Sequence, residues 1–291
     1  MGLELYQSSP AAKAVFDEVD EALGAAVSRI FFEGPEAELT KTVNAQPGIM
    51  TVSMACLKAM EEALGKDRMP TPAMVAGHSL GEYTALVAAG ALSIADGARL
   101  VRERGRLMQY AAELREGGMA AILGMDDAVL EEVCRETDTQ ISNINAPDQI
   151  VISGERQAVE KAMELASARG ARRTVALAVA GAFHSRLMEP AQEGLAKIVG
   201  ELTFHEPTVP VVANCTGRPL TTVEDIKQEL VSGLCTCVQW KDSVAYMTQS
   251  GIGAFYEIGP GRVLSGMVKR NIPEADVTNV NDLESIRLLS G

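Results

Sequence analysis

The stretch that decides the fold is Gly77-His78-Ser79-Leu80-Gly81, which fits the pattern Gly-x-Ser-x-Gly. A short apolar run, Ala73-Met-Val-Ala76, precedes it, and helix-forming residues follow from Glu82 to Ala89. This order predicts a strand, a tight turn and a helix, with the serine hydroxyl projecting from the turn. We expect small residues on both sides of Ser79 because a larger side chain would clash with the neighbouring strand and helix.

A serine in such a turn is a candidate nucleophile, and the N–H of Leu80 is a candidate donor to an oxyanion. A nucleophilic serine needs a base, and the chain offers three histidines. His184 lies between a predicted strand and a predicted helix, where open α/β sheets place active sites. We therefore predict that His184 is the base. His78 would be aimed away from the serine hydroxyl, and His205 fits a structural role better.

The composition excludes several classes of protein. The 291 residues carry 26 Lys and Arg against 39 Asp and Glu, a formal charge of −13, whereas a general nucleic-acid binder is basic. The longest apolar stretch, residues 175–183, is too short to span a bilayer, and no secretion signal is visible. The five cysteines form no zinc-ligand pattern, which predicts reduced thiols, a cytoplasmic location and no metal site.

Strand-like and helix-like segments alternate along the chain, which predicts an α/β fold with a mainly parallel sheet. Six segments in the middle of the chain predict strands and helices in the order βαββαβ: 119–123, 126–136, 140–143, 149–153, 155–168 and 173–179. This order is typical of a ferredoxin-like arrangement. We therefore expect a large α/β domain, residues 1–115 and 182–291, with a smaller ferredoxin-like subdomain, residues 116–181, inserted in it.

Two prolines mark expected helix starts in the N-terminal part. Ser9 and Pro10 predict the N-cap and the first residue of a helix, because proline is favoured at that position. In the same way, Gln46-Pro47 predicts a helix that begins after the proline and runs to Leu64.

A cluster of arginines, Arg102-Glu-Arg104-Gly-Arg106, follows the predicted turn and helix. An arginine buried near a nucleophilic serine would bind a carboxylate with two parallel hydrogen bonds. The alternative interpretation is a solvated basic helix face, and the cluster taken alone favours that alternative.

Taken together, five motifs resemble the malonyl-CoA:acyl carrier protein transacylase family. They occur in the family's order over essentially the whole chain: Gly77-His-Ser-Leu-Gly-Glu82-Tyr, Arg104-Gly, Gly181-Ala-Phe-His184-Ser, Val238-Gln-Trp240 and Glu257-Ile-Gly-Pro-Gly261. The resemblance implies an α/β-hydrolase-like large domain with a ferredoxin-like insert. It implies that Ser79 accepts the acyl group, that His184 is the base and that Arg104 pairs with the malonyl carboxylate, while the Leu80 N–H serves as an oxyanion donor.

The resemblance also implies roles for residues that no local pattern singles out. Gln46 matches a glutamine near the acyl pocket, and Asn143 and Asn145 match an Asn-x-Asn pair that faces the cleft. The backbone carbonyl of Gly233, at a position where the family usually has glutamine, would orient the base. Phe183 resembles the residue of the malonyl-selecting form, because its ring would meet bulkier acyl groups.

The family opens with a strand and a Gly-Gln-Gly-Ser-Gln loop before the Met-Gly that stands here as Met1-Gly2. That loop supplies the second oxyanion donor, and losing such a donor lowers the rate by about 10²–10³-fold. The comparison with the family leaves two expectations: either the reading frame starts upstream of Met1, or this form is catalytically impaired.

The resemblance implies a ping-pong transfer from malonyl-CoA to an acyl carrier protein, in fatty acid biosynthesis, by a monomer that needs no metal or redox cofactor. A serine esterase or thioesterase is the first alternative. It needs an acid between serine and histidine, for which Asp96, Asp126, Asp127 and Asp148 are available, and it leaves Arg104 unexplained. A non-catalytic protein that only binds the carrier is the second alternative.

Carrier proteins are acidic, so docking on a chain of net charge −13 requires a local basic surface. The candidate residues are Arg169, Arg172, Arg173, Arg186 and Lys269-Arg270.

Overall fold

The computed structural model describes residues 1–290, and they divide into two compact units. Unit 1 is formed by Met1–Gly105, Leu202–Val212 and the chain from Thr248 onward, and unit 2 by Arg106–Glu201 and Ala213–Met247. The predicted division into residues 1–115 and 182–291 with an insert at 116–181 stays a prediction.

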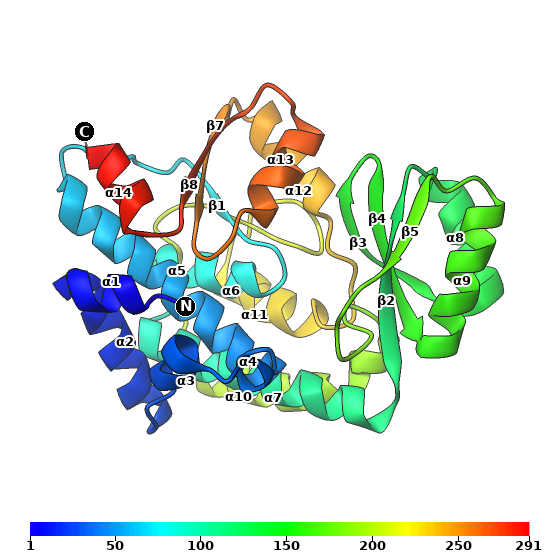
Figure 1. Ribbon diagram of the computed structural model, residues 1–291, viewed down its shortest axis with the longest axis horizontal. Helices are drawn as coiled ribbons and strands as arrows, with labels where there is room; N and C mark the ends of the chain where they lie inside the picture. Colours follow the sequence, from blue (N-terminus) through cyan, green and yellow to red (C-terminus); the bar gives the residue numbers. More distant parts are fainter. Residues whose placement is uncertain (291) are drawn as a thin grey trace. The chain divides into compact units, whose positions relative to one another are not determined.

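Unit 1 is mainly helical and contains two pairs of parallel strands (Figure 1). One pair is β1 (Val75–Ala76) with β6 (Val211–Val212), and the other is β7 (Ala254–Ile258) with β8 (Asp276–Val280). The helices of this unit are α1 (Leu3–Ser8), α2 (Pro10–Leu23), α3 (Ser28–Glu33), α4 (Glu36–Leu39), α5 (Thr42–Leu64), α6 (Leu80–Ala88), α13 (Val263–Asn271) and α14 (Leu283–Ser290). Helix α7 (Ile94–Leu114) begins in unit 1 and ends in unit 2.

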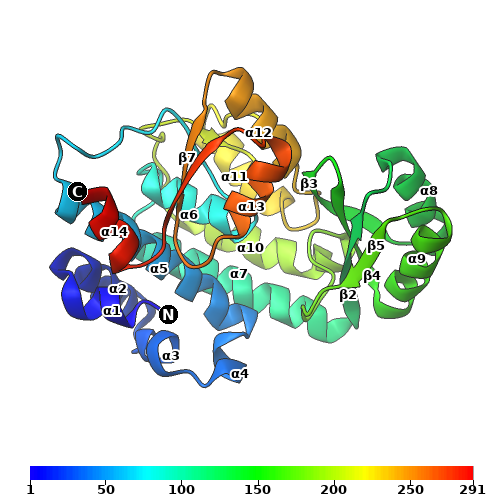
Figure 2. The same ribbon diagram turned by 45° about the horizontal axis from the view of Figure 1, so that its top comes forward.

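Helix α5 is the long central helix of unit 1, and α1, α2 and α14 pack against it (Figure 2). It begins at Thr42, several residues before the start predicted from Pro47. Pro47 lies inside the helix, where it leaves the Val43 carbonyl without its usual donor because proline has no N–H. The helix therefore includes Gln46, which the sequence placed before it.

Unit 2 contains a four-stranded antiparallel sheet in the order β3-β4-β2-β5. Its elements follow one another as β2 (Gly117–Leu123), α8 (Asp127–Thr137), β3 (Gln140–Ala146), β4 (Gln149–Glu155), α9 (Arg156–Ala168) and β5 (Arg173–Ala176). Helices α8 and α9 cover one face of the sheet, and buried apolar side chains such as Ile122, Leu130 and Ile152 fill the layer between them (Figure 1). This βαββαβ arrangement confirms the ferredoxin-like fold predicted for the segment.

Unit 2 also contains the end of α7, a short 3₁₀ turn, Arg186–Met188, and three further helices, the last of which ends just inside unit 1. These helices are α10 (Glu189–Glu201), α11 (Val223–Ser232) and α12 (Trp240–Gln249). The segment before α12 extends the antiparallel sheet, because the Val238 N–H donates to Ser142 and the Val238 carbonyl accepts from Ile144 at the edge strand β3.

The α/β class, with parallel strands in unit 1 and an antiparallel sheet in unit 2, is confirmed. Within residues 1–290, no helix combines the length and the apolar character needed to cross a membrane.

Candidate active site

Ser79 lies in a strained turn between β1 and α6, as the sequence predicted. Its φ of 52° and ψ of −103° place a non-glycine residue in a region that costs about 1–3 kcal/mol and that is common at active sites. Gly77 makes the turn possible, since a Cβ there would lie 2.0 Å from the carbonyl of Gly81. The matching expectation for Gly81 is wrong, because a Cβ on Gly81 would meet nothing within 4 Å.

Leu80 is the first residue of α6, so its N–H is one of the helix's initial donors that have no acceptor within the helix. The partial positive charge of the helix N-terminus lies at the same place. This is the geometry that an oxyanion donor next to Ser79 requires.

Arg104 is buried beside the serine, with an exposed fraction of 3%. Its Nη2 donates to Ser79 Oγ at 3.0 Å, and its Nη1 donates to Oε1 of Gln46 at 2.7 Å. The guanidinium lies over the ring of Tyr83, 4.9 Å from the centroid. Arg104 forms no ion pair with any residue of the described chain, and its Nε is buried without a hydrogen-bond partner. A buried cation in this state has unused capacity for an anionic ligand.

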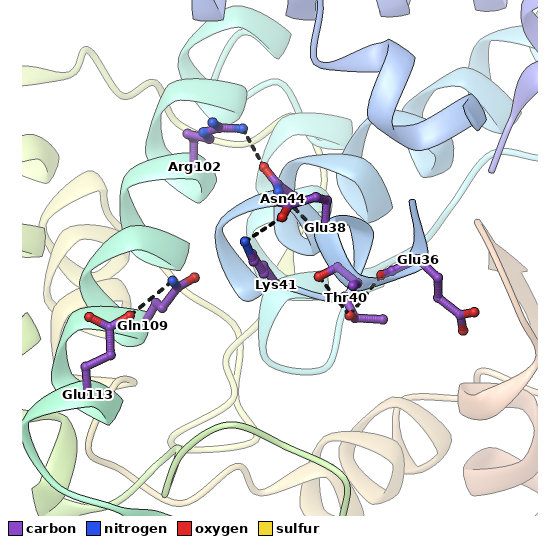
Figure 3. A network of polar contacts seen from close by, with 9 residues as sticks. Glu36, Glu38, Thr40, Lys41, Asn44, Arg102, Gln109 and Glu113 are labelled. Atoms are coloured by element: carbon purple, nitrogen blue, oxygen red, sulfur yellow. Dashed lines mark hydrogen bonds and ion pairs between the residues drawn. The ribbon is translucent and has the colours of Figure 1, made fainter. Parts of the chain in front are cut away.

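The contact between α5 and α7 holds this arginine in place. Gly105 lies so close to α5 that a Cβ would be 2.6 Å from the carbonyl of Thr42. Figure 3 shows Arg102 reaching Asn44 of α5, with Arg102 Nη1 3.0 Å from Asn44 Oδ1. The Nδ2 of Asn44 in turn donates to the carbonyl of Glu38 at 2.8 Å. The arginine cluster is therefore no simple solvated face, since two of its members bind α5.

His184 is buried, with an exposed fraction of 5%, and its φ of 56° is unusual for a residue with a side chain. Its Nδ1 lies 2.7 Å from the carbonyl oxygen of Gly233. A carbonyl can only accept, so Nδ1 carries the proton and Nε2 has the lone pair in the neutral ring. This is the tautomer that a general base working through Nε2 requires.

Gly233 is the C-cap of α11, and two cysteines follow it closely. Burial raises the pKa of the Cys235 thiol to about 11 and that of Cys237 to about 12. Both therefore remain protonated at neutral pH and are poor nucleophiles.

The other predicted site residues of unit 2 lie on or next to the antiparallel sheet. Asn143 and Asn145 are buried in β3, where the register with β4 shifts on both sides of the pair Asn143 and Ile144. The Oδ1 of Asn143 accepts from Ser142 Oγ at 3.1 Å. Phe183 packs on the face of the sheet opposite the helices, against Met119, Ala121 and Val151.

Within unit 1 the structure thus brings Ser79, Leu80, Gln46 and Arg104 together, and within unit 2 it brings His184 onto Gly233. Sequence reasoning missed one residue near the base: Glu229, a buried carboxylate in α11. The available signal was its position on the apolar face of that helix, beside Ile226 and Leu230.

The candidate basic residues of unit 2 are mostly paired. Arg169 binds Glu136 at 2.7 Å and Arg172 binds Asp148 at 2.9 Å, and Arg186 pairs with Asp138. Arg173 is exposed and forms no ion pair with the residues that the structure describes.

A strained serine, a buried arginine and a histidine held by a carbonyl are typical of a serine acyltransferase. The family described as acyl transferase domain matches residues 1–289. The chain is 45% identical to the malonyl CoA-acyl carrier protein transacylase of Bacillus subtilis (strain 168), over 99% of this chain and 91% of that protein. It belongs to the malonyl CoA-acyl carrier protein transacylase family.

Solved structures agree with this assignment. An acyl-carrier-protein-S-malonyltransferase from Bartonella henselae superimposes with a TM-score of 0.93 at 41% identity, over 100% of this chain and 95% of that one. A type II PKS acyl-carrier protein in complex with its malonyl-transacylase gives a TM-score of 0.94 at 37% identity, covering 99% of this chain and 94% of that one.

Proposed function

We propose that the protein transfers a malonyl group from coenzyme A to the phosphopantetheine thiol of an acyl carrier protein, in fatty acid or polyketide synthesis. The observation that carries the proposal is the buried guanidinium of Arg104, which forms no ion pair with the described residues and whose Nη2 is 3.0 Å from Ser79 Oγ. It supports an acyl group that ends in a carboxylate. The names of the relatives support the same substrate.

The reaction proceeds in two balanced halves. His184 Nε2 takes the proton of Ser79 as Oγ attacks the malonyl thioester, and the Leu80 N–H stabilises the tetrahedral oxyanion. The C–S bond then breaks, and the leaving thiolate of coenzyme A takes the proton from His184. In the second half the phosphopantetheine thiol gives its proton to His184 and attacks the acyl-serine ester, and the Ser79 oxygen leaves with that proton.

Arg104 binds the malonyl carboxylate in this proposal and so selects it over an acetyl group. Gln46 fixes the orientation of the guanidinium. Phe183, Asn143 and Asn145 contribute to the selection of the acyl group in this proposal. In this proposal Ser79 is the nucleophile, His184 is both base and acid, and Arg104 binds the anion. The proposed reaction therefore uses no metal or redox cofactor.

The way the histidine is held weighs against the esterase or thioesterase alternative. Such an enzyme uses a carboxylate to orient the base, whereas His184 Nδ1 donates to the Gly233 carbonyl.

We also propose that the protein is a monomer and that it is located in the cytoplasm. The five free cysteines support this location, because thiols stay reduced there.

The decisive test uses radiolabelled malonyl-CoA with the purified full chain, with and without phosphopantetheinylated carrier protein. We expect label on the enzyme, its transfer to the carrier and little free malonate, and no label on a Ser79→Ala variant. Free malonate as the main product would establish the hydrolase instead. Binding of the carrier without any label on Ser79 would establish a non-catalytic carrier-binding protein.

A further inference from the structure

The carbonyl that holds His184 belongs to a residue with no side chain. Glycine has more backbone freedom than other residues, so the peptide after Gly233 is not oriented by its own side chain. The hydrogen bond of 2.7 Å between His184 Nδ1 and this carbonyl nevertheless requires a fixed direction. Neighbouring groups must therefore provide that direction.

A buried carboxylate lies one helical turn before Gly233. Glu229 has an exposed fraction of 6%, and its Oε1 accepts the N–H of Cys215 at 2.7 Å. Its backbone carbonyl accepts the N–H of Gly233 at 2.8 Å. Glu229 forms no ion pair with any of residues 1–290. A buried carboxylate without a cation is costly, and an apolar residue would fill the same place at lower cost if packing were its only role.

The hydrogen bond that the Cys215 N–H donates to Glu229 holds Cys215 next to Gly233. A Cβ placed on Gly233 would lie 3.8 Å from Cys215 Sγ, which is ordinary van der Waals contact. The same Cβ would lie 2.9 Å from the Glu229 carbonyl oxygen, closer than real Cβ atoms approach. The peptide of Gly233 is therefore enclosed by the backbone of Glu229 and by the residue that the Glu229 side chain holds.

Two other carbonyls at the end of α11 have side-chain donors of their own. The Gln228 carbonyl accepts from Ser232 Oγ at 2.7 Å, and the Ser232 carbonyl accepts from Thr236 Oγ1 at 2.9 Å. The carbonyl of Gly233 is the one that serves the histidine. It lies at the negative end of the helix, which makes it a strong acceptor for the His184 Nδ1 proton.

We propose that Glu229 is a positioning residue for the base. Its hydrogen bond to the Cys215 N–H holds the last turn of α11, so that the Gly233 carbonyl meets His184 Nδ1 and keeps Nε2 directed for proton transfer. The kinetic consequence rests on the proposed transferase function, whereas the hydrogen bond itself does not.

Three substitutions separate the hydrogen bond from the charge. Glu229→Gln keeps an acceptor oxygen and removes the charge, Glu229→Ala removes both, and Glu229→Asp keeps the charge on a side chain too short to reach Cys215. Glu224→Gln is the matched control, since Glu224 is an exposed acid in the first turn of the same helix. We expect kcat to fall about tenfold in the Ala and Asp variants with little change in KM. The Gln variant should stay within about twofold of the parent, like the control.

Proton NMR provides a readout that does not depend on catalysis. The chain has three histidines, so the signal of the His184 Nδ1 proton can be assigned by its loss in a His184→Gln variant. We expect this signal in the parent chain and in Glu229→Gln, and its loss through exchange with water in folded Glu229→Ala and Glu229→Asp.

The proposal is overturned if folded Glu229→Asp keeps both the parent kcat and the Nδ1 signal, or if Glu229→Gln is as slow as Glu229→Ala. Glu229→Asp keeps the test valid if the Ala variant does not fold. A parent chain that transfers no malonyl group, combined with the expected NMR pattern, would remove the proposed function and leave the positioning role in place.

Discussion

At the scale of the residue, Arg104 combines a contact with the nucleophile and a contact with a neighbouring amide. It donates to the serine oxygen and to Gln46, and it keeps an Nε without a partner. A guanidinium so close to Oγ stabilises negative charge on that oxygen, and its remaining N–H groups can donate to a carboxylate. The residue therefore links the recognition of the acyl group to the position of the nucleophile.

Replacement of Arg104 tests this link. We expect Arg104→Ala to lower kcat/KM for malonyl transfer about a hundredfold, because the hydrogen bonds to a charged carboxylate are lost. Acetyl transfer should fall much less, and Arg104→Lys should restore only part of the activity since a lysine cannot bind bidentately. Parallel assays with malonyl-CoA and acetyl-CoA measure both, with Arg99→Ala, an exposed site on the same helix, as control. An unchanged preference for malonyl over acetyl groups would contradict the assignment of Arg104 as the residue that binds the malonyl carboxylate.

The two glycines around Ser79 make a matched pair for stability. Gly77→Ala should destabilise the protein by more than about 3 kcal/mol, since its Cβ would overlap the Gly81 carbonyl at 2.0 Å. Gly81→Ala should be neutral or stabilise by about 0.5–1 kcal/mol, because the site is open and alanine is the better helix former. Urea unfolding of the two variants measures both, and equal losses would contradict the geometry.

At the scale of the element, local signals were sufficient where caps and periodicity decide the structure. Ser9 and Pro10 were predicted as the N-cap and the first residue of a helix, and they have these positions in α2, where the Ser9 side chain accepts the N–H of Ala12. The start of α5 was missed because tertiary contacts stabilise the turn before Pro47 in spite of the proline. The His184–Gly233 bond joins residues 49 positions apart, so no local pattern reveals it, and only the family resemblance suggested it.

The same distinction applies to Arg104 and Glu229. An arginine in a run of charged residues has the pattern of an exposed helix face, and only the close approach of α5 buries it. Glu229 interrupts an apolar face, which is a visible but weak signal, because many such acids lie at the edge of a helix. Elements and caps were thus predictable from the sequence, whereas contacts between distant segments were not.

The N-cap of α8 gives a prediction at this scale. Asp126 accepts the N–H of Ala128 at 3.0 Å, so Asp126→Ala should lower the free energy of unfolding by about 1 kcal/mol. Asp126→Asn should stay within a few tenths of a kcal/mol, because asparagine caps about as well. Thermal or urea unfolding compares the two variants, and a loss in both would mean that the charge, rather than the cap, matters.

At the scale of the whole molecule, the net charge of −13 repels an acidic carrier protein and so disfavours its docking. Several arginines that could offset it are already paired with carboxylates, which reduces their local field. Arg173 is exposed in β5 and forms no ion pair within the described chain. It is therefore the strongest of these candidates in unit 2 for contact with the carrier.

Charge reversal tests this surface. We expect Arg173→Glu to raise the KM for carrier protein about three- to tenfold, with the KM for malonyl-CoA unchanged, and the effect to shrink in high salt. A second reversal at Arg172 should add less, since Arg172 is neutralised by Asp148. Lys161→Glu, on the exposed side of α9, is the control of equal charge. If the KM for carrier stays at its parent value, this pair has no part in docking.

The topology of the antiparallel sheet has a consequence for how such a chain can be assembled from genetic segments. The strand that opens the ferredoxin-like segment, β2, is hydrogen-bonded to the strand that closes it, β5, with Ala120 opposite Ala176. The segment thus begins and ends at nearly one place, and it has an apolar core of its own between the sheet and its two helices. We accordingly expect that a coding block for residues 117–176 can be exchanged for a homologous block with only a short splice, as in domain-insertion events, provided that the new block keeps an edge strand for Val238.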